Sequence, residues 1–185
     1  MLYHVSKIEG LKIIEPRVST HGKAYVYAID NMVTALLFGA KKDDFDFIID
    51  VNEDELPVIY ECYPNAFEQI YKNKSCSVYE LDNEGFMYGK TGWAPELVSE
   101  NATNVRNETI VNDVYKRLLD EEEKNNLIIH RYEASIEYKK LISNHIVDRL
   151  IRYEIVDRPI TDDRFMKYFG NIVLALLDVL SGKYL

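Results

Sequence analysis

The spacing of apolar residues changes once along this chain, near residue 108. Before that point, short runs of β-branched and aromatic residues are separated by turn residues, which is typical of strands. The clearest runs lie at residues 2–6, 24–29, 45–51, 57–62 and 75–81, and weaker ones lie at 96–99 and 103–105. Short helices are expected at 31–38, where Asp30 or Asn31 can cap the first turn, and at 65–71.

After residue 108 the spacing becomes helical. One apolar series comprises Ile110, Val114 and Leu118, and a second runs from Ile129 and Tyr132 to Leu150. The acidic stretch 120–123 is expected to be a turn or a solvated face between these helices. A last helix is expected to open at Thr161, because its hydroxyl can cap the amides that follow.

This change of period predicts an α+β chain in two parts. Residues 1–108 are expected to form an α+β domain, and residues 109–185 a helical segment. A chain of 185 residues is long enough for a domain of about 100 residues with a smaller appendage. The last helix has a broad apolar stripe between Phe165 and Leu180, so the helical segment is expected to cap the sheet or to form a homo-oligomer.

The charge of the chain limits its partners. Its 31 acidic and 22 basic residues give a formal net charge of −9, which repels polyanions and argues against a broad nucleic-acid-binding surface. The first residues lack the basic-then-apolar pattern of a secretory signal, so a cytoplasmic location is expected. The strongest apolar run, 172–180, is about half the length needed to cross a bilayer, so no membrane contact is expected.

Cysteine and histidine spacing gives no metal site. Cys62 and Cys76 are too few to bind a metal by themselves, and both are expected to be small buried hydrophobic residues. His130 and His145 fall on predicted helix among polar residues, so exposed positions are expected for both.

His4 is the first candidate for chemistry. Strand alternation places His4 and Ser6 on one side of the segment 2–6. A histidine beside a hydroxyl can be a satisfied core residue, or it can bind the hydroxyl and carbonyl groups of a ligand. These residues alone leave both interpretations open. The 14 tyrosines are equally ambiguous, because tyrosine suits half-buried strands as well as the walls of a pocket.

The order of segments around His4 is more specific. The strand Leu2-Tyr3-His4-Val5-Ser6 is followed by a loop with Pro16, the polar segment 19–23, the strand Ala24-Tyr25-Val26-Tyr27-Ala28-Ile29 and a helix with Ala35. This order resembles the opening of small ADP-ribosyltransferase-like proteins, especially the rifampin ADP-ribosyltransferase type, and of RNA 2′-phosphotransferases. The segments Ser77-Val78-Tyr79-Glu80-Leu81 and Glu96-Leu97-Val98-Ser99 extend the resemblance, which covers roughly residues 2–105.

The resemblance implies a split β-sheet core and a binding site for NAD, which would be the substrate. His4 would bind the ribose and the amide of NAD, with Ser6 beside it. Tyr27 would stack on the nicotinamide, with Tyr25 near it. His21 lies in the polar loop, where it would approach the phosphates of a dinucleotide, although the polarity of the loop explains this residue equally well.

A transferase of this kind also needs a fixed carboxylate. The carboxylate holds the ribose and stabilises the positive charge that develops as nicotinamide leaves. Glu96 is the first choice for this role, and Glu84 and Glu100 are the alternatives. The acceptor of the ADP-ribose is not indicated by any motif.

Two other hypotheses stay open. Val5 stands where most relatives have glycine, so the chain can also be a catalytically inactive member of the same fold that binds a nucleotide or a protein. Alternatively, its function lies in the helical segment, whose apolar stripe would form a dimer.

Overall fold

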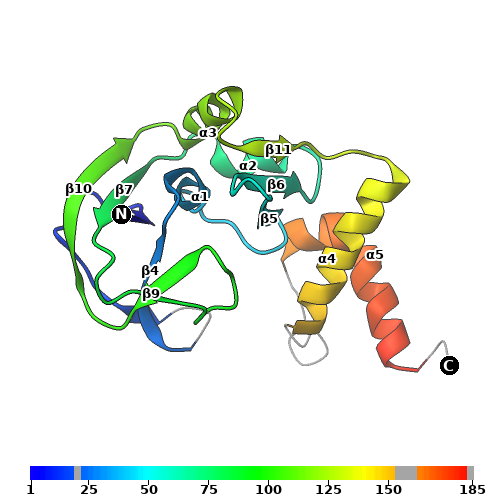
Figure 1. The fold of residues 1–185 in the computed structure, drawn as a ribbon. Coiled ribbons are helices and arrows are strands. Elements are labelled where there is room, and N and C mark those ends of the chain that lie inside the picture. Colours follow the sequence, from blue (N-terminus) through cyan, green and yellow to red (C-terminus); the bar gives the residue numbers. More distant parts are fainter. Residues whose placement is uncertain (19–21, 153–161, 183–185) are drawn as a thin grey trace. The chain divides into compact units, whose positions relative to one another are not determined.

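The computed structural model describes residues 1–18, 22–152 and 162–182 (Figure 1). It contains both helices and sheets, which confirms the α+β class. The chain divides into two compact units. Unit 1 contains Met1–Lys42, Asn52–Pro57 and Phe67–Ile128, and unit 2 contains Asp43–Val51, Val58–Ala66 and Ile129–Leu185. Each unit is therefore assembled from separate stretches of sequence.

Unit 1 is built on a sheet that has eight strands among the described residues. In chain order they are β1 (Leu2–Ser6), β2 (Ile13–Ile14), β3 (Arg17–Val18), β4 (Ala24–Ile29), β7 (Cys76–Leu81), β8 (Met87–Tyr88), β9 (Glu96–Ser99) and β10 (Thr103–Val111). The spatial order is β2-β10-β7-β1-β4-β9-β8, and β3 pairs with β4. The predicted strands 2–6 and 24–29 agree with β1 and β4.

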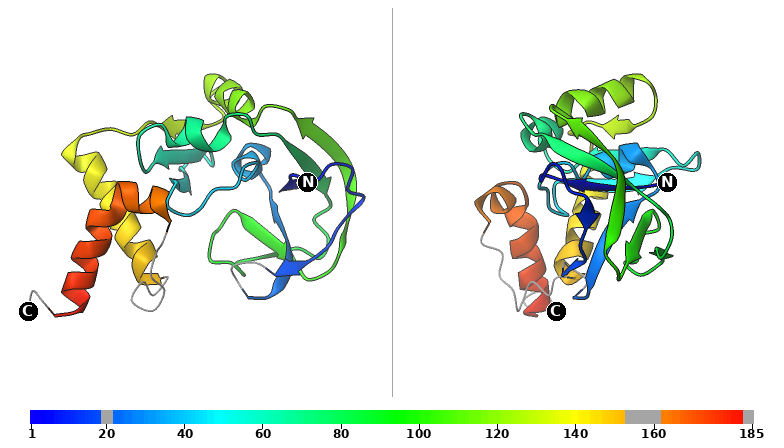
Figure 2. Two further views of the ribbon diagram at one scale, coloured as in Figure 1. Left: turned by 180° about the vertical axis from the view of Figure 1, so that it is seen from behind. Right: turned by 90° about the vertical axis from the view of Figure 1, so that its left-hand side faces the viewer.

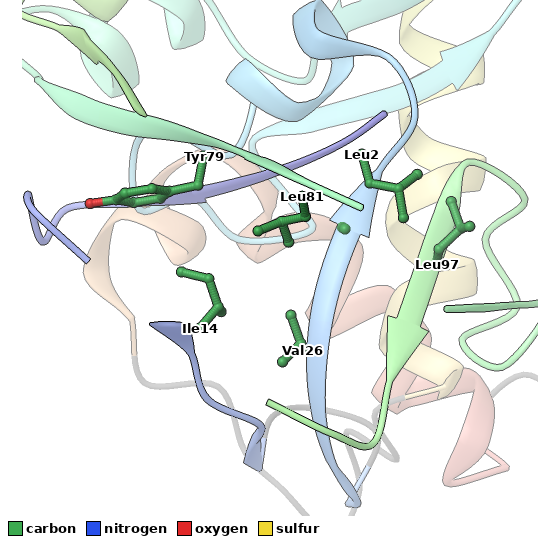
Figure 3. Packing of buried hydrophobic residues seen from close by; sticks show 7 residues of the cluster. Leu2, Ile14, Val26, Tyr79, Leu81 and Leu97 are labelled. Atoms are coloured by element: carbon green, nitrogen blue, oxygen red, sulfur yellow. The ribbon is translucent and has the colours of Figure 1, made fainter. Parts of the chain in front are cut away.

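The junction between β1 and β4 has the shortest register in this sheet. Tyr3 pairs with Ile29 there, whereas β1 pairs with β7 along its whole length, from Leu2 opposite Leu81 to Ser6 opposite Ser77. Fewer paired residues therefore join β1 to β4 than join β1 to β7, within one continuous order of strands that Figure 2 shows from two sides. The close-up in Figure 3 shows β1 and β7 running across the direction of β4 and β9.

A hydrophobic core fills the inside of the curved sheet (Figure 3). It consists of buried side chains from the five strands β1, β2, β4, β7 and β9: Leu2, Ile14, Val26, Ala28, Tyr79, Leu81 and Leu97. Their positions alternate along the strands, as expected when one face of each strand is buried. Burial of a leucine or valine side chain stabilises a fold by roughly 1.5 to 3 kcal/mol, so this core stabilises the packing of these strands.

Three helices belong to unit 1 among the described residues. They are α1 (Met32–Leu36), α2 (Ala66–Tyr71), which lies in this unit from Phe67 onward, and α3 (Val114–Glu123). The side chain of Asn31 accepts the amide of Thr34 at 2.9 Å, so Asn31 is the cap of α1. Helix α1 contacts β1, β4, β7 and α3.

Unit 2 combines a small sheet with two long helices. The sheet has the order β11-β6-β5, with β5 (Phe47–Val51), β6 (Pro57–Glu61) and β11 (Ile128–His130). Helices α4 (Ile136–Arg152) and α5 (Asp163–Leu180) contact each other. Helix α5 buries Phe165, Phe169 and Val173, which follow one another at four-residue steps and therefore share a face.

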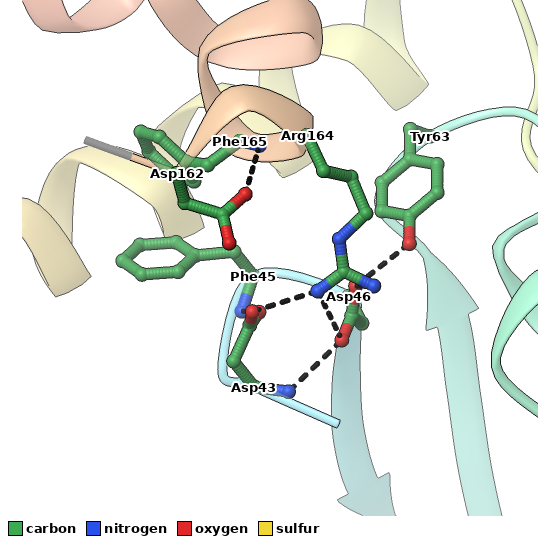
Figure 4. Close-up of polar contacts among 7 residues, drawn as sticks. All are labelled: Asp43, Phe45, Asp46, Tyr63, Asp162, Arg164 and Phe165. Carbon is green, nitrogen blue, oxygen red and sulfur yellow. Dashed lines mark hydrogen bonds and ion pairs between the residues drawn. The ribbon is translucent and has the colours of Figure 1, made fainter. Parts of the chain in front are cut away.

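A buried carboxylate anchors α5 inside unit 2 (Figure 4). Asp46 is 1% exposed and accepts hydrogen bonds from the Tyr63 hydroxyl at 2.7 Å and from the amide of Asp43 at 2.9 Å. The Arg164 guanidinium lies 3.1 Å from Asp46 Oδ1 and also donates to Asp43 at 2.8 Å. Four polar partners from three segments of the chain therefore meet at one site.

Some expectations for the second half of the chain were wrong. Ile110 lies in β10 and Ile129 in β11, so the helical series begin later than expected, at Val114 and Ile136. Of the two alternatives for the acidic stretch 120–123, the turn was wrong, because these residues continue α3. Short apolar spacings fit both a strand and a helix, and here the pairing of strands decided between them.

The start of the last helix also differs in detail. Asp162 accepts the amide of Phe165 at 2.8 Å and caps α5 (Figure 4). Thr161, the expected cap, lies outside the described residues.

Of the two histidines in unit 2, only His130 is exposed as expected. His130 is exposed, but it lies on β11 and stacks on Tyr60, with ring centroids 4.3 Å apart. His145 is half-buried, and its Nε2 lies 2.9 Å from the carbonyl oxygen of Asp44. The expectation of an exposed His145 was therefore wrong.

The burial of the cysteines and the length of the helices can also be compared with the expectations from the sequence. Cys62 and Cys76 are free thiols with 1% and 3% exposure, which confirms them as buried hydrophobic residues. Within the described part of the chain, no helix combines the length and the apolar character that a bilayer crossing requires. The domain boundary near residue 108 stays a prediction, and β10 runs across that position.

Candidate functional site

The candidate residues lie on three neighbouring strands of unit 1. His4 and Ser6 are on β1, Tyr25 and Tyr27 are on β4, and Glu96 begins β9. These strands are adjacent in the order β1-β4-β9, so the residues gather around the junction of β1 and β4. His21 lies outside the described residues.

His4 is hydrogen-bonded to the neighbouring strand, β4. Its Nδ1 lies 2.8 Å from the backbone oxygen of Tyr27. A carbonyl oxygen only accepts, so Nδ1 carries the proton and donates it. Burial lowers the pKa of His4, which favours the neutral ring, and the Tyr27 carbonyl opposes this shift in part. In a neutral ring with Nδ1 protonated, Nε2 carries a lone pair and accepts hydrogen bonds.

Strand register places Tyr27 and Glu96 on one face of the β4–β9 pair. Tyr27 is opposite Val98, and two residues further along Ile29 is opposite Glu96. Opposed residues and those two positions away point to the same side of a sheet, and such diagonal neighbours are roughly 7 to 8 Å apart. The tyrosine ring and the carboxylate can therefore contact one small ligand.

Tyr25 belongs to the same face. Its ring meets that of Tyr27 edge to face, with centroids 6.0 Å apart, and the ammonium group of Lys23 lies 5.7 Å from the centre of the Tyr25 ring. Lys23 also forms an ion pair of 2.6 Å with Glu100. This face of β4 thus presents two aromatic rings, one cation and carboxylates.

The side chains of His4 and Tyr27 do not share one continuous face. His4 is opposite Tyr79 on β7 and shares one face of β1 with Leu2, whereas Val26 and Ala28, on either side of Tyr27, belong to the core cluster that includes Leu2. By alternation, the Tyr27 ring is on the side of β4 away from that cluster. His4 is therefore joined to Tyr27 through the Tyr27 backbone, at the junction of β1 and β4.

The three candidate carboxylates have different surroundings in the structure. Glu84 is exposed in the turn between β7 and β8. Glu100 is bound by Lys23 at 2.6 Å and follows the end of β9. Glu96 is half-buried, and its amide donates to the carbonyl of Trp93 at 3.1 Å, which fixes the turn that leads into β9. Of the three, Glu96 is the one whose register opposite β4 places it on the same face as Tyr27.

Ser6 has a local structural role. Its hydroxyl oxygen accepts the amide of Ile8 at 3.1 Å and holds the turn that follows β1. Ser6 is also opposite Ser77 on β7. It therefore lies beside His4 on the strand as expected, with its oxygen directed at the backbone.

Sequence reasoning missed Glu108 on β10. Glu108 Oε1 lies 2.7 Å from the Ser77 hydroxyl and 2.9 Å from the Tyr79 hydroxyl, and the amide of Gly10 donates to both carboxylate oxygens at 2.9 and 3.2 Å. These donors lower the pKa of Glu108, with the Gly10 amide making the largest contribution. The only sign of this site in the sequence was that Ser77 and Tyr79 are two residues apart and therefore place two hydroxyl groups on one face of β7.

Glu108 continues the row of residues that contains His4. His4 is opposite Tyr79 on β7, and Tyr79 is opposite Glu108 on β10. The Tyr79 hydroxyl also lies 2.6 Å from the carbonyl of Ile8. The row therefore fixes the loop after β1, and with it the C-terminal end of the strand that carries His4.

Metal chemistry has no preformed centre in the described residues. No group of three or more His, Cys, Asp and Glu side chains is arranged there to hold a metal ion. The buried acidic cluster of unit 2 instead uses Arg164 as its counter-charge.

Comparisons with protein-family models, curated proteins and solved structures give no significant match to this chain. The geometry of the site is thus the basis on which a function can be argued.

Proposed function

We propose that this protein is an ADP-ribosyltransferase-like enzyme that binds NAD between His4, Tyr27 and Glu96. The observation that carries the proposal is the hydrogen bond of 2.8 Å from His4 Nδ1 to the Tyr27 carbonyl. This bond joins the two residues across neighbouring strands, and with Nδ1 as the donor the lone pair of Nε2 is the part of the ring that can accept a hydrogen bond. A ribose hydroxyl is a suitable donor to that lone pair.

The remaining groups fit the other parts of NAD. The Tyr27 and Tyr25 rings, 6.0 Å apart, offer an aromatic surface for the nicotinamide ring. Glu96 is on the same face as Tyr27, where a carboxylate would lie near the ribose that carries the nicotinamide. Placement on strands keeps these groups rigid, as a preorganised site requires.

The proposed reaction breaks the bond between nicotinamide nitrogen and ribose C1′. The bonding electron pair leaves with nicotinamide, and positive charge develops on the ribose ring. Glu96 stabilises that charge, and an acceptor nucleophile then bonds to C1′ and loses its proton to solvent. With water as the acceptor, the products are ADP-ribose and free nicotinamide.

Trp93 offers a direct test of binding. It is the only tryptophan of the chain, and its carbonyl holds the turn before Glu96. NAD bound beside Glu96 is expected to change the Trp93 fluorescence in a saturable way and to raise the melting temperature. Nicotinamide and ADP-ribose, tested separately, identify which half of NAD is bound. No saturable response to NAD would contradict the proposal.

Release of nicotinamide tests the chemistry. Glu96→Gln keeps the size of the side chain and removes its charge, so we expect NAD binding to persist while nicotinamide release falls by about 100-fold or more. Glu84→Gln is the matched control, because Glu84 is exposed in another turn, and it should leave the rate unchanged. If NAD binds without nicotinamide release by the wild type, the protein is a binding module of the same kind.

A further inference from the structure

Unit 2 contains a cavity of about 170 Å³ that is separate from the NAD site proposed above. The segment after β6, the segment after β11 and helices α4 and α5 form its walls. An engineered apolar cavity of roughly 150 Å³ is large enough to bind benzene, so this one has room for a single aromatic ring.

Aromatic side chains held in fixed positions form much of the lining. Tyr63 stacks on Tyr168 with ring centroids 4.2 Å apart and an angle of 11° between the planes, and the Tyr63 hydroxyl is bound to Asp46 at 2.7 Å. Tyr132 is fixed by its amide, which donates to Glu61 at 2.9 Å, and its ring meets Tyr138 edge to face. A cavity with preset aromatic walls is suited to a planar ring, because little order is lost on binding.

Helix α4 supplies the polar side of the cavity. Lys139 and Ser143 are four residues apart and share the face of α4 that lines it, with Ile142 beside them. Among the lining residues, Lys139 is the one that carries a formal charge, and it has no ion pair within the described parts of the chain. Burial raises the pKa of the Cys62 thiol, so Cys62 adds no negative charge.

We propose that this cavity binds a small aromatic carboxylate. The ring would lie among Tyr63, Tyr132, Tyr168 and Phe169, and the carboxylate would pair with the Lys139 ammonium and accept the Ser143 hydroxyl. A small number of polar groups at one side of an otherwise apolar cavity is the usual arrangement of small-molecule sites. The charge of Lys139 selects an anion even though the chain as a whole is acidic.

Benzoate is the probe for this site. Titration of the full chain with benzoate, followed by NMR of labelled isoleucine methyl groups, is expected to shift the signals of Ile142 and Ile172, which both line the cavity. A ligand of about nine non-hydrogen atoms should bind with a dissociation constant on the order of 1 mM.

Lys139→Gln and Lys140→Gln form the decisive pair of variants. Both lysines are exposed on α4, but only Lys139 lines the cavity, so both variants should fold. Loss of a charged hydrogen bond should weaken benzoate binding by about tenfold in Lys139→Gln, whereas Lys140→Gln should bind as the wild type does. Neutral benzyl alcohol should bind equally to all three proteins.

Three results would overturn the proposal. The first is the absence of saturable shifts at Ile142 and Ile172, and the second is equal benzoate affinity of Lys139→Gln and Lys140→Gln. The third is a preference of the wild type for benzyl alcohol over benzoate. Failure of NAD to bind leaves this test unaffected, because the two sites lie in different units.

Discussion

The stability of unit 1 depends on the charge of the His4 ring, which is hydrogen-bonded to the Tyr27 carbonyl. Burial lowers the pKa of His4 in the folded protein below its ordinary value of 6.5, and burial does the same for His145 in unit 2. Between the folded and unfolded pKa values the unfolded chain binds more protons. The stability contributed by the neutral rings is therefore present above about pH 6.5 and is lost as the pH falls below it.

We expect the free energy of unfolding to fall when the pH is lowered from about 7 to about 5.5. His4→Gln and His145→Gln should each reduce this difference, and the double variant should reduce it further. Urea denaturation at the two pH values measures the effect. His130→Gln is the control, since His130 is exposed on β11, and an equal reduction in that variant would contradict the assignment.

The pH dependence of Glu108 has the same sign as that of the two histidines and lies in a more acidic range. Its pKa is lowered in the folded protein by the Gly10 amide and the Ser77 and Tyr79 hydroxyls. The stability that it contributes is thus present above its unfolded pKa, near 4.5, and is lost as the pH falls through the lower folded value.

Glu108→Gln should therefore flatten the decline of melting temperature between about pH 5 and pH 3. The variant should also loosen the loop after β1, which hydrogen exchange of the Gly10 amide would detect. Glu84→Gln, in an exposed turn, should keep the wild-type decline. The same decline in Glu108→Gln as in the wild type would show that the carboxylate is not held as described.

At the scale of elements, Gly39 governs how α1 meets its neighbours. A Cβ atom at this position would lie 2.8 Å from Cys76 Sγ, 3.0 Å from the Leu36 carbonyl and 3.3 Å from Val114. Since Leu36 contributes rigid backbone and the neighbouring side chains are buried, the packing cannot relax freely. Glycine is required here by space, and its backbone conformation is an ordinary one.

Gly39→Ala should destabilise the protein by about 1 to 3 kcal/mol, the usual cost of overpacking a core. Gly170 in α5 provides a matched comparison, because a Cβ there meets only the flexible end of Met166 at 3.5 Å. Gly170→Ala should stabilise α5 by about 0.5 to 1 kcal/mol through helix propensity. Denaturant unfolding measures both, and effects of the same sign would refute the packing argument.

Elements with one strong local signal could be predicted from the sequence. Strands β1 and β4 combine β-branched and aromatic residues with clear alternation, and α1 has its cap at Asn31. By contrast, β11 is three residues long, and the spacing of Ile129 and Tyr132 fits a helix equally well. Strand β10 runs through polar residues such as Asn107 and continues past residue 108, because pairing with β7 stabilises it.

The residues of the candidate site could likewise be predicted only where the local sequence is distinctive. His4, Tyr27 and Glu96 could be named because each lies in a recognisable segment. Glu108 could not be found, since its partners Gly10 and Ser77 are far from it in sequence and only the strand register brings them together. The lining of the unit 2 cavity depends in the same way on the packing of α4 and α5, which no local pattern encodes.

At the scale of the whole molecule, unit 2 joins three separate stretches of the chain, and Arg164 links two of them. Its guanidinium pairs with Asp43 and with the buried Asp46. Arg164→Met would leave the Asp46 carboxylate buried without a cation. Removing one partner of a charged, buried hydrogen bond costs about 2 to 3 kcal/mol, so this variant should lower the stability of unit 2 substantially.

The effect should be confined to the unit that contains the pair. Hydrogen exchange followed by mass spectrometry should show loss of protection in α4 and α5, while β1, β4 and β7, whose core lies within unit 1, keep theirs. Adding Asp46→Asn to Arg164→Met should restore part of the protection, because the uncompensated charge is then removed. Arg106→Met, which breaks an exposed ion pair with Asp82, should change neither unit measurably. Equal loss of protection in both units would mean that they unfold as one cooperative body, and that Arg164 stabilises the entire chain.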